Sequence, residues 1–298
     1  MRINKLLNFI VCPHCHLRKL TLERKEIVCH NCNSSYEVVD GVPVLIKDIY
    51  LSEQEKEQKR IYEKGYAYIS AEKYQLENWN KSICKRVFSV EVKDRIKTYV
   101  DLGCGATAYT VIEAAKKGWT SFGIDLSIEL VIKAKFIAKK QGVEENAGFL
   151  VASAENLPFK SNTFDYVSGI GLLEHLENDT KVIKSVNQIL RKKGLFYILA
   201  PNSYRRTYPF FWPLEYYIDK TIGHKRHYSI EGLSQKMKQG GFALDKVFYN
   251  GHMVKFIEVL MEVLHLRLVS DKTWWEIDRK DINNNSSGLH LNAIFRKS

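Results

Sequence analysis

The sequence predicts an α/β fold, built on a mostly parallel sheet with helices on both faces and preceded by a small cysteine-rich module. From about residue 96 onward, short apolar segments alternate with longer amphipathic ones, which is the pattern of parallel strands joined by helical crossovers. Residues 1–48 hold four of the six cysteines. The intervening residues 49–95 are charged and tyrosine-rich, with mainly helical propensity. We therefore expect a small module over 1–48, a helical linker and pocket cover over 49–95, and the α/β domain over 96–298.

The composition is that of an ordinary soluble globular protein, because 45% of the 298 residues are hydrophobic and 27% are charged. No apolar run reaches the roughly 18 residues of a membrane-spanning helix, so no transmembrane segment is expected. The opening stretch MRINKLLNFIVCPHC has no small-residue cleavage site and is interpreted as the first strand of the module, not as a secretory signal. Together with the cysteine spacing described below, this predicts a cytoplasmic protein.

The net charge is +11, from 45 Lys and Arg against 34 Asp and Glu. Such an excess attracts nucleic acid or an anionic membrane surface. The basic residues are spread along the chain and form no block of about five or six like charges. Nucleic-acid binding is therefore the less favoured interpretation, and peripheral contact with a membrane stays open.

The four N-terminal cysteines are spaced C-x2-C-x13-C-x2-C, at Cys12, Cys15, Cys29 and Cys32. Each close pair presents two thiolates from one tight turn, and two such turns complete a tetrahedral site. We expect zinc in this site, with an iron centre and disulfides as the alternatives. Because four thiolates leave no open position on zinc, its role is expected to be structural. Three histidines are alternative ligands that we expect to be exposed instead: His14, His16 and His30.

The residues around these cysteines resemble a known kind of zinc ribbon. The stretch from Phe9 to Leu45 contains both cysteine pairs, and the segment SYEVVDGVPVLI is predicted to form two strands joined by a turn at Asp40-Gly41. This stretch resembles the small zinc-binding subunits that activate tRNA, rRNA and release-factor methyltransferases. In that family the ribbon is usually a separate subunit, so the resemblance implies a ribbon fused in cis.

Five strands and three helices are predicted in the α/β domain before its last strand. The strands are expected at 98–103, 121–126, 148–153, 164–170 and 194–202, and the helices at 109–118, 127–142 and 178–194. Ser127 is the expected N-cap of the second helix, and Gly142 its expected end. The alternating stretch LHLNAIF at 289–295 predicts a final antiparallel strand.

The loop TYVDLGCGATAYTV carries the first functional signal. Its Gly103 and Gly105, followed by Ala108, fit the loose glycine pattern of a dinucleotide site. Asp101 lies at the end of the preceding strand, where it would repel a pyrophosphate and attract a cation. S-adenosylmethionine (SAM) carries an ammonium and a sulfonium and has no phosphate, so this loop favours SAM over NAD. Asp125, at the end of the second strand, can accept the ribose hydroxyls of either ligand.

The order of four motifs strengthens this interpretation. They are DLGCG (101–105), GIDLS (123–127), ASAENLPF (152–159) and LRKKGLFYILAPN (190–202). In this order, the region 96–250 resembles the class I SAM-dependent methyltransferases that act on quinones, sterols and other small molecules. The resemblance implies a Rossmann-like methyltransferase fold, with a mostly parallel seven-stranded sheet whose last strand is antiparallel.

The same resemblance implies which residues hold the donor. The expected cofactor-binding residues are Asp101, Gly103, Gly105, Asp125, Leu126, Ser153, Ala154, Glu155 and Ile170. Ser153, Ala154 and Glu155 would flank the adenine, and the loop from Ile170 to Leu172 would line the donor. The family commonly has Gly-Asp where this chain has Ala152-Ser153, and an uncharged serine predicts weaker donor affinity. Tyr62, Tyr66 and Tyr68 are expected to cover the donor, as the corresponding segment does in relatives.

The methyl acceptor is less well defined by the sequence. The stretch SGIGLLEH (168–175) lacks the Asn/Asp-Pro-Pro-aromatic motif of enzymes that methylate base amines, which disfavours adenine or glutamine N-methylation. The candidate catalytic residues are His175, which can deprotonate a hydroxyl, and His224 and His227 of the stretch GHKRHYS. The structural alternative for His175 is a helix-start histidine bonded to backbone. Lys225 or Arg226 would hold an anionic group of the acceptor.

Two apolar stretches favour a small or lipid-linked acceptor. They are YPFFWPLEYYI (208–218) and VKFIEVLMEVLHLRL (254–268), although stripes of this kind usually face a core. We therefore expect a SAM-dependent methyltransferase of a small or lipid-linked metabolite, with O- or C-methylation favoured. The alternatives are an rRNA or tRNA methyltransferase that uses the zinc ribbon for RNA recognition, and a non-catalytic SAM-binding scaffold.

Overall fold

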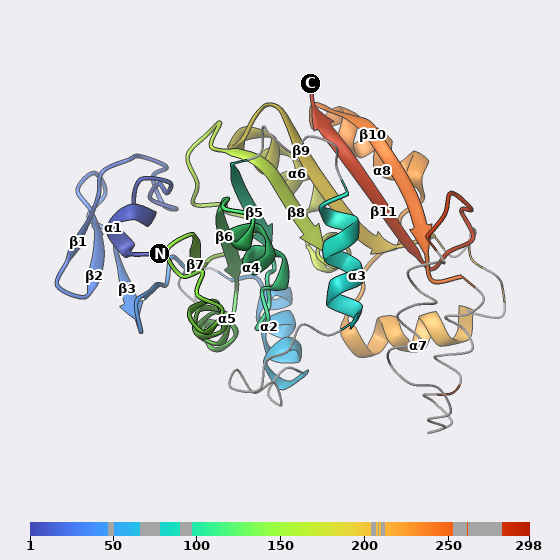
Figure 1. The fold of residues 1–298 in the computed structure, drawn as a ribbon, viewed down its shortest axis with the longest axis horizontal. Coiled ribbons are helices and arrows are strands. Elements are labelled where there is room, and N and C mark those ends of the chain that lie inside the picture. The colour runs from blue at the N-terminus through green and yellow to red at the C-terminus, as the bar shows by residue number, and fades with distance from the viewer. Residues whose placement is uncertain are drawn as a thin grey trace.

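The computed structural model describes residues 1–46, 51–65, 78–89, 97–203, 207, 209, 212–252, 261 and 282–298. It contains a four-stranded sheet in the N-terminal module and a seven-stranded sheet in the α/β domain (Figure 1). Among these residues, no helix is long and apolar enough to cross a membrane. The predicted apolar stretch at 254–268 lies outside the described residues apart from position 261, as do Tyr66 and Tyr68.

The N-terminal module is a small antiparallel ribbon with strand order β1-β2-β3-β4. Its elements are α1 (Ile3–Leu6), β1 (Leu20–Glu23), β2 (Glu26–Cys29), β3 (Ser35–Val39) and β4 (Val42–Pro43). Asp40 and Gly41 both have positive φ, which confirms the predicted turn. The strand predicted at the N-terminus is wrong. Ile3–Leu6 is a short helix because Leu6 turns into the core and the Met1 amino group bonds the Ala147 carbonyl of the α/β domain at 2.8 Å.

The large sheet has strand order β10-β11-β9-β8-β5-β6-β7. Its strands are β5 (Thr98–Leu102), β6 (Thr120–Asp125), β7 (Ala147–Val151), β8 (Phe164–Ile170), β9 (Leu190–Pro201), β10 (Phe242–Asn250) and β11 (His290–Lys297). The last strand, β11, is antiparallel to both of its neighbours, and the pairs from β7 to β9 are all parallel. The predicted seven-stranded sheet with an antiparallel last strand is therefore confirmed.

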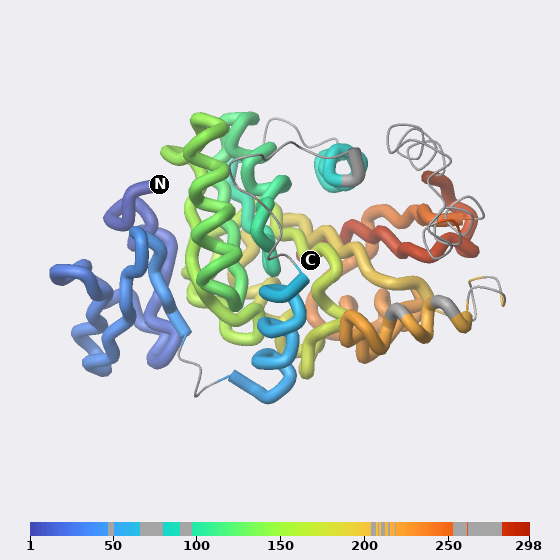
Figure 2. The backbone as a smooth tube through the Cα atoms, turned by 90° about the horizontal axis from the view of Figure 1, so that it is seen from below, coloured from blue at the N-terminus to red at the C-terminus, as the bar shows by residue number. Residues whose placement is uncertain are grey.

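Helices cover both faces of this sheet (Figure 2). They are α3 (Asn78–Val87), α4 (Tyr109–Lys116) and α5 (Ile128–Lys140) on one face, and α6 (Asp179–Ile189) and α8 (Ile230–Gln239) on the other. Ser127 caps α5 by accepting a 3.3 Å hydrogen bond from the Leu130 amide, and Gly142 follows the helix with a φ of 67°. Helix α6 ends at Ile189, earlier than predicted, because Leu190 already pairs with Phe164 as the start of β9.

The zinc-ribbon module packs against the edge strand β7. The Leu45 amide donates to the Val151 carbonyl at 2.8 Å, and the Val11 amide donates to the Pro158 carbonyl at 2.9 Å. Apolar residues of the module, among them Ile10 and Ile27, share one core with the α6 face of the sheet. The module thus covers an edge that would otherwise expose unpaired backbone groups, and it holds the chain that follows β7.

Two helices lie at the carboxyl end of the sheet. They are α2 (Glu53–Gly65) and α7 (Trp212–Ile222), which Figure 1 places below the strands. Helix α2 bonds residues that follow three different strands: Ser127 after β6, Ser153 after β7 and His175 after β8. On α7, Tyr216 and Tyr217 are 58% and 69% exposed, so the described part of the predicted aromatic stretch lies largely at the surface.

Candidate active site

A cavity of about 290 Å³ opens at the carboxyl end of the parallel strands, beneath α2. Ligands of open α/β sheets bind at this edge, because the loops that follow the strands converge there. Eight of the nine predicted cofactor residues line the cavity: Asp101, Gly103, Gly105, Asp125, Leu126, Ala154, Glu155 and Ile170. Ser153 does not line it.

Asp101 lies at the base of this cavity and is 4% exposed. Its carboxylate accepts hydrogen bonds of 2.5 Å from the hydroxyls of Thr110 and Ser168. Burial raises the pKa of Asp101 to about 6, against the opposing effect of these two hydroxyls. Asp101 is therefore mainly ionised at pH 7, in surroundings where a cation would be strongly attracted. Thr110 and Ser168 are site residues that the sequence did not reveal.

The glycine loop and Asp125 form the next part of the cavity. Gly103 and Gly105 have φ values of 74° and 60°, in the left-handed region that favours glycine. The Gly105 amide donates to Asp125 Oδ2 at 3.0 Å, and the Ser127 amide donates to Asp125 Oδ1 at 3.1 Å. These bonds hold the Asp125 carboxylate at the cavity wall, where its remaining lone pairs can accept further hydrogen bonds.

Ser153 contacts a carboxylate from another element. Its hydroxyl donates to Glu55 Oε1, and it accepts a 3.0 Å bond from the Glu155 amide. Glu55 also completes a capping box with Ser52 at the start of α2, because each residue's side chain accepts from the other's backbone amide. The carboxylate that the family commonly has at position 153 is absent, and the carboxylate of Glu55 lines the cavity beside it.

Helix α2 contributes one face to the cavity. Glu55, Gln58, Lys59 and Tyr62 all line it, at the i, i+3, i+4 and i+7 spacing of a single helical face. Sequence reasoning identified only Tyr62 among them. The spacing was visible in the sequence, but every residue of the stripe is polar or amphipathic, so no apolar pattern distinguished it from a solvated face.

His175 lines the cavity at its other end, in the 3-10 helix η3 (Leu173–His175). Its Nδ1 lies 3.3 Å from the Gly223 carbonyl, which can only accept, so Nε2 accepts the 2.9 Å hydrogen bond from the Tyr62 hydroxyl. Burial, reinforced by His224, lowers the pKa of His175 to about 4, so its ring is neutral at pH 7. His175 therefore both bonds a backbone carbonyl, as its structural interpretation predicts, and lines the cavity, as its catalytic interpretation requires.

His224 and His227 do not line the cavity. Both contact Asp219 of α7: His224 Nδ1 lies 2.8 Å from Oδ1, and His227 Nε2 lies 2.9 Å from Oδ2. The His224 ring packs on that of His175, with 4.8 Å between centroids. His224 thus lies one ring behind the cavity wall, and His227 lies behind His224, with 6.2 Å between their ring centroids. Their predicted contact with the methyl acceptor stays a prediction.

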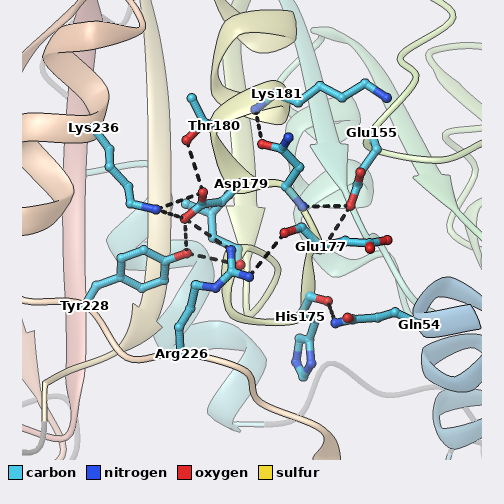
Figure 3. Close-up of polar contacts among 12 residues, drawn as sticks. Gln54, Glu155, His175, Glu177, Asp179, Thr180, Lys181, Arg226, Tyr228 and Lys236 are labelled. Atoms are coloured by element: carbon cyan, nitrogen blue, oxygen red, sulfur yellow. Dashed lines mark hydrogen bonds and ion pairs between the residues drawn. The ribbon is translucent and has the colours of Figure 1, made fainter. Parts of the chain in front are cut away.

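Lys225 and Arg226, which were predicted to hold an anionic group of the acceptor, do not line the cavity. Arg226 pairs with Asp179 at 3.3 Å, and Asp179 also accepts from Lys236 and from the Tyr228 hydroxyl (Figure 3). This cluster fastens the segment before α8 to the start of α6. Lys225 is exposed.

Glu155 has a comparable anchoring role. Its Oε1 accepts hydrogen bonds from the amides of Glu177 and Asn178, at 2.9 Å and 3.3 Å, just before α6 begins (Figure 3). The side chain that was expected beside the adenine therefore also ties the loop after β7 to the start of α6.

The four cysteines of the ribbon lie together. Cys12 Sγ and Cys32 Sγ are 3.6 Å apart, as are Cys15 Sγ and Cys29 Sγ, and none of the described cysteines forms a disulfide. Zinc–sulfur bonds of about 2.3 Å in a tetrahedron require sulfur atoms roughly 3.8 Å apart, so this set is compatible with zinc. His14, His16 and His30 are exposed and stand outside the cluster, as expected.

Comparisons with known proteins agree with this architecture. Residues 100–198 match the family model described as a methyltransferase domain, and residues 4–41 match the model of Trm112p-like proteins. Norajmaline N-methyltransferase of Rauvolfia serpentina is 41% identical over 104 residues, which cover 35% of this chain and 36% of that protein. Chloroplastic tocopherol O-methyltransferase of Arabidopsis thaliana is 31% identical over 110 residues, which cover 37% of this chain and 32% of that protein.

A solved structure of geranyl diphosphate methyltransferase in complex with SAM superposes with a TM-score of 0.54 at 16% identity, covering 73% of this chain and 84% of that chain. At this identity the likeness shows the fold alone. This chain spans about a third of the length of the curated relatives named above. Together with the motif order, the sheet and the cysteine cluster, these matches identify a Trm112p-like zinc ribbon over residues 4–41 and a class I SAM-dependent methyltransferase domain that includes residues 100–198.

Proposed function

We propose that this protein transfers a methyl group from SAM to a small or lipid-linked molecule. The observation that carries the proposal is the charge of the cavity. Four carboxylates line it, from Glu55, Asp101, Asp125 and Glu155, and Lys59 is the only Lys or Arg among the described lining residues. Such a wall attracts a sulfonium and an ammonium and repels a pyrophosphate, which supports SAM and disfavours a dinucleotide.

The residues of the cavity divide the recognition of SAM between them. Asp101, ionised and buried, suits the cationic end of the donor, and Asp125 suits the ribose hydroxyls. Leu126 and Ala154 offer apolar surface of the cavity to the adenine. When bound, SAM supplies an electrophilic methyl carbon, and the protein contributes chiefly alignment.

The Tyr62–His175 pair supports an oxygen acceptor. Both side chains line the cavity, and Tyr62 donates its proton to Nε2 of a neutral imidazole. A hydroxyl acceptor that bonds the Tyr62 oxygen can lose its proton to that oxygen while the Tyr62 proton moves to His175. The imidazole then becomes charged against the burial that lowers its pKa to about 4, so the step depends on the acceptor anion being consumed by the methyl transfer. This arrangement favours O-methylation, although relatives named for both N- and O-methylation share the domain.

The zinc ribbon is proposed to act in cis as a scaffold for the donor site. It holds the chain after β7 at Val151 and Pro158, on both sides of the residues Ala154 and Glu155 that line the cavity. Covalent fusion removes the entropy cost of association that a separate activating subunit would pay.

Two measurements test the function. Isothermal titration should show binding of SAM and none of NAD, and tritiated SAM should then label one fraction among lipid, small-molecule and RNA extracts. Label in the lipid or small-molecule fraction supports the proposal. Label in RNA alone would replace it with RNA methylation, and SAM binding without label in any fraction would replace it with a SAM-binding scaffold.

A further inference from the structure

Three side chains beside the cavity converge in a way that the methyl-donor site does not require. Asp219 lies on α7, and His224 and His227 follow that helix, with the spacing D-x4-H-x2-H. Their side chains are 15%, 12% and 10% exposed, and the candidate ligand atoms of the three lie within 4.8 Å of one another. Histidine and carboxylate side chains that are largely shielded from solvent and converge in this way can bind transition ions in proteins.

The hydrogen bonding of His227 requires a proton or a metal ion between its ring and Asp219. Its Nδ1 lies 2.7 Å from the Asn202 carbonyl, which only accepts, so Nδ1 carries the hydrogen. In a neutral ring the lone pair of Nε2 then faces Asp219, whose two oxygens lie 2.9 Å and 3.0 Å away. Two acceptors at this distance repel each other unless a proton or a metal ion lies between them.

His224 is oriented in the same manner. Its Nδ1 faces Asp219 Oδ1 at 2.8 Å, and its Nε2 faces Glu174 Oε1 at 3.9 Å. The Glu174 side chain is 3% exposed, and its Oε2 has no hydrogen-bond partner among the described residues. Both imidazoles therefore direct one nitrogen at Asp219, and the other nitrogen of His227 is hydrogen-bonded to the Asn202 carbonyl. Metal-bound histidines characteristically have this outer acceptor, because it fixes which nitrogen coordinates the ion.

We propose that Asp219, His224 and His227 form a second metal site, which binds a divalent first-row transition ion through one carboxylate oxygen, Nδ1 of His224 and Nε2 of His227. Ions of this class bind at about 2.0–2.2 Å, which places ligand atoms roughly 3–3.5 Å apart. The separations between the Asp219 oxygens and the two imidazole nitrogens, 2.8–3.0 Å, are already close to that range. Three protein ligands leave a coordination position open, unlike the four thiolates of the ribbon. The site is independent of the proposed methyl transfer.

Metal content provides the first test. The full-length protein, incubated with Zn²⁺ and dialysed, is expected to retain two equivalents of zinc, one in each site. His227→Ala and Asp219→Asn should each retain only the zinc of the ribbon. Cys29→Ser should retain only the zinc of the second site. His14→Ala, at an exposed ribbon position, is the matched control and should retain two. One equivalent in the unaltered protein, or an unchanged content in both His227→Ala and Asp219→Asn, would overturn the proposal.

Cobalt distinguishes the two sites if His227→Ala or Asp219→Asn fails to fold. Co²⁺ in the four-cysteine site gives intense thiolate-to-metal absorption, whereas a histidine and carboxylate site gives only weak ligand-field bands. In Cys29→Ser, Co²⁺ should still produce the weak bands, and these should disappear in Cys29→Ser combined with His227→Gln. Histidine NMR of the unaltered protein should show shifts at His224 and His227 on addition of Zn²⁺. A doubly protonated His227 that does not respond to excess Zn²⁺ would identify an ion pair and contradict the metal site.

Discussion

The Ser153 hydroxyl donates a hydrogen bond to the Glu55 carboxylate, and this contact joins the loop after β7 to the first turn of α2. A serine at this position predicted weak donor binding, because the carboxylate common in relatives is missing. In the folded chain a carboxylate from α2 lies next to the serine, at the cavity wall. The acidic character of this part of the site is therefore retained by a residue far away in sequence.

The contribution of Glu55 to SAM binding can be tested by moving its negative charge to position 153. We expect Glu55→Gln to weaken SAM binding by about tenfold, the effect of losing one charged hydrogen-bond acceptor. Ser153→Asp should also weaken it, because two carboxylates would face each other, whereas the double variant should recover most of the affinity. Titration calorimetry measures all three, with Glu57→Gln on the same helix as the control. Additive losses in the double variant would show that Glu55 acts only as a helix cap.

Asp101 should make SAM binding dependent on pH. Burial raises the pKa of Asp101 to about 6, so the proton must leave before a cation can bind. Affinity is expected to be constant above about pH 7 and to fall by up to about tenfold for each pH unit below 6. Asp101→Asn should bind SAM more weakly and lose this dependence, while Asp245→Asn at the surface keeps it. Because the folded pKa lies above the unfolded value, Asp101 stabilises the unliganded protein most below pH 4 and loses this effect as pH rises through 6.

The Tyr62–His175 pair is expected to act in the transfer step and not in donor binding. Tyr62→Phe removes the hydroxyl between the acceptor and His175. It should lower kcat by about a hundredfold, measured with the acceptor that the labelling experiment identifies. The Kd for SAM should change little, because Asp101 and Asp125 remain in place. Tyr217→Phe, whose side chain is exposed on α7, is the control. An unchanged kcat in Tyr62→Phe would exclude the relay and leave His175 with a structural role.

Loss of zinc from the ribbon should weaken SAM binding. Cys29→Ser is expected to release the ribbon zinc and to unfold residues 1–46, detected by metal analysis and by limited proteolysis. Because the ribbon holds the chain at Val151 and Pro158, SAM affinity should fall by roughly threefold to tenfold. If the variant loses its zinc and binds SAM as tightly as before, the ribbon has no effect on the donor site.

Asp179 should contribute stability that disappears in acid. It is buried, which opposes ionisation, but Lys236, Tyr228 and Arg226 outweigh this and lower its pKa. A lowered folded pKa means that the stabilisation is present above the unfolded value near 4 and is lost as pH falls below it. Asp179→Asn should cost about 1–3 kcal/mol at pH 7, discounted for partial exposure of Lys236, and much less at pH 3. Urea denaturation at both pH values measures the difference, and an equal loss at both would assign the effect to packing.

The sequence by itself determined the fold and most of the residues that line the cavity. Strands β5 to β9 are short apolar runs bounded by turn residues, and period and length suffice to predict them. Asp101, Gly103, Gly105 and Asp125 lie within or directly after such strands, and the carboxyl ends of parallel strands meet at one edge, so their convergence followed from the topology. The cysteines were equally predictable, because their spacing is local.

Only the tertiary structure decided which residues complete the site from a distance. The contact of Ser153 with Glu55, of Tyr62 with His175, and of Asp219 with His227 each joins elements whose relative position no local pattern specifies. These residues are polar, and a polar side chain shows no periodic signal that separates a cavity wall from solvent. The packing of α2 and α7 over the end of the sheet decides which of these polar side chains face the cavity. Burial in that packing, and not residue type alone, then sets the charge and the hydrogen-bond partners of each side chain.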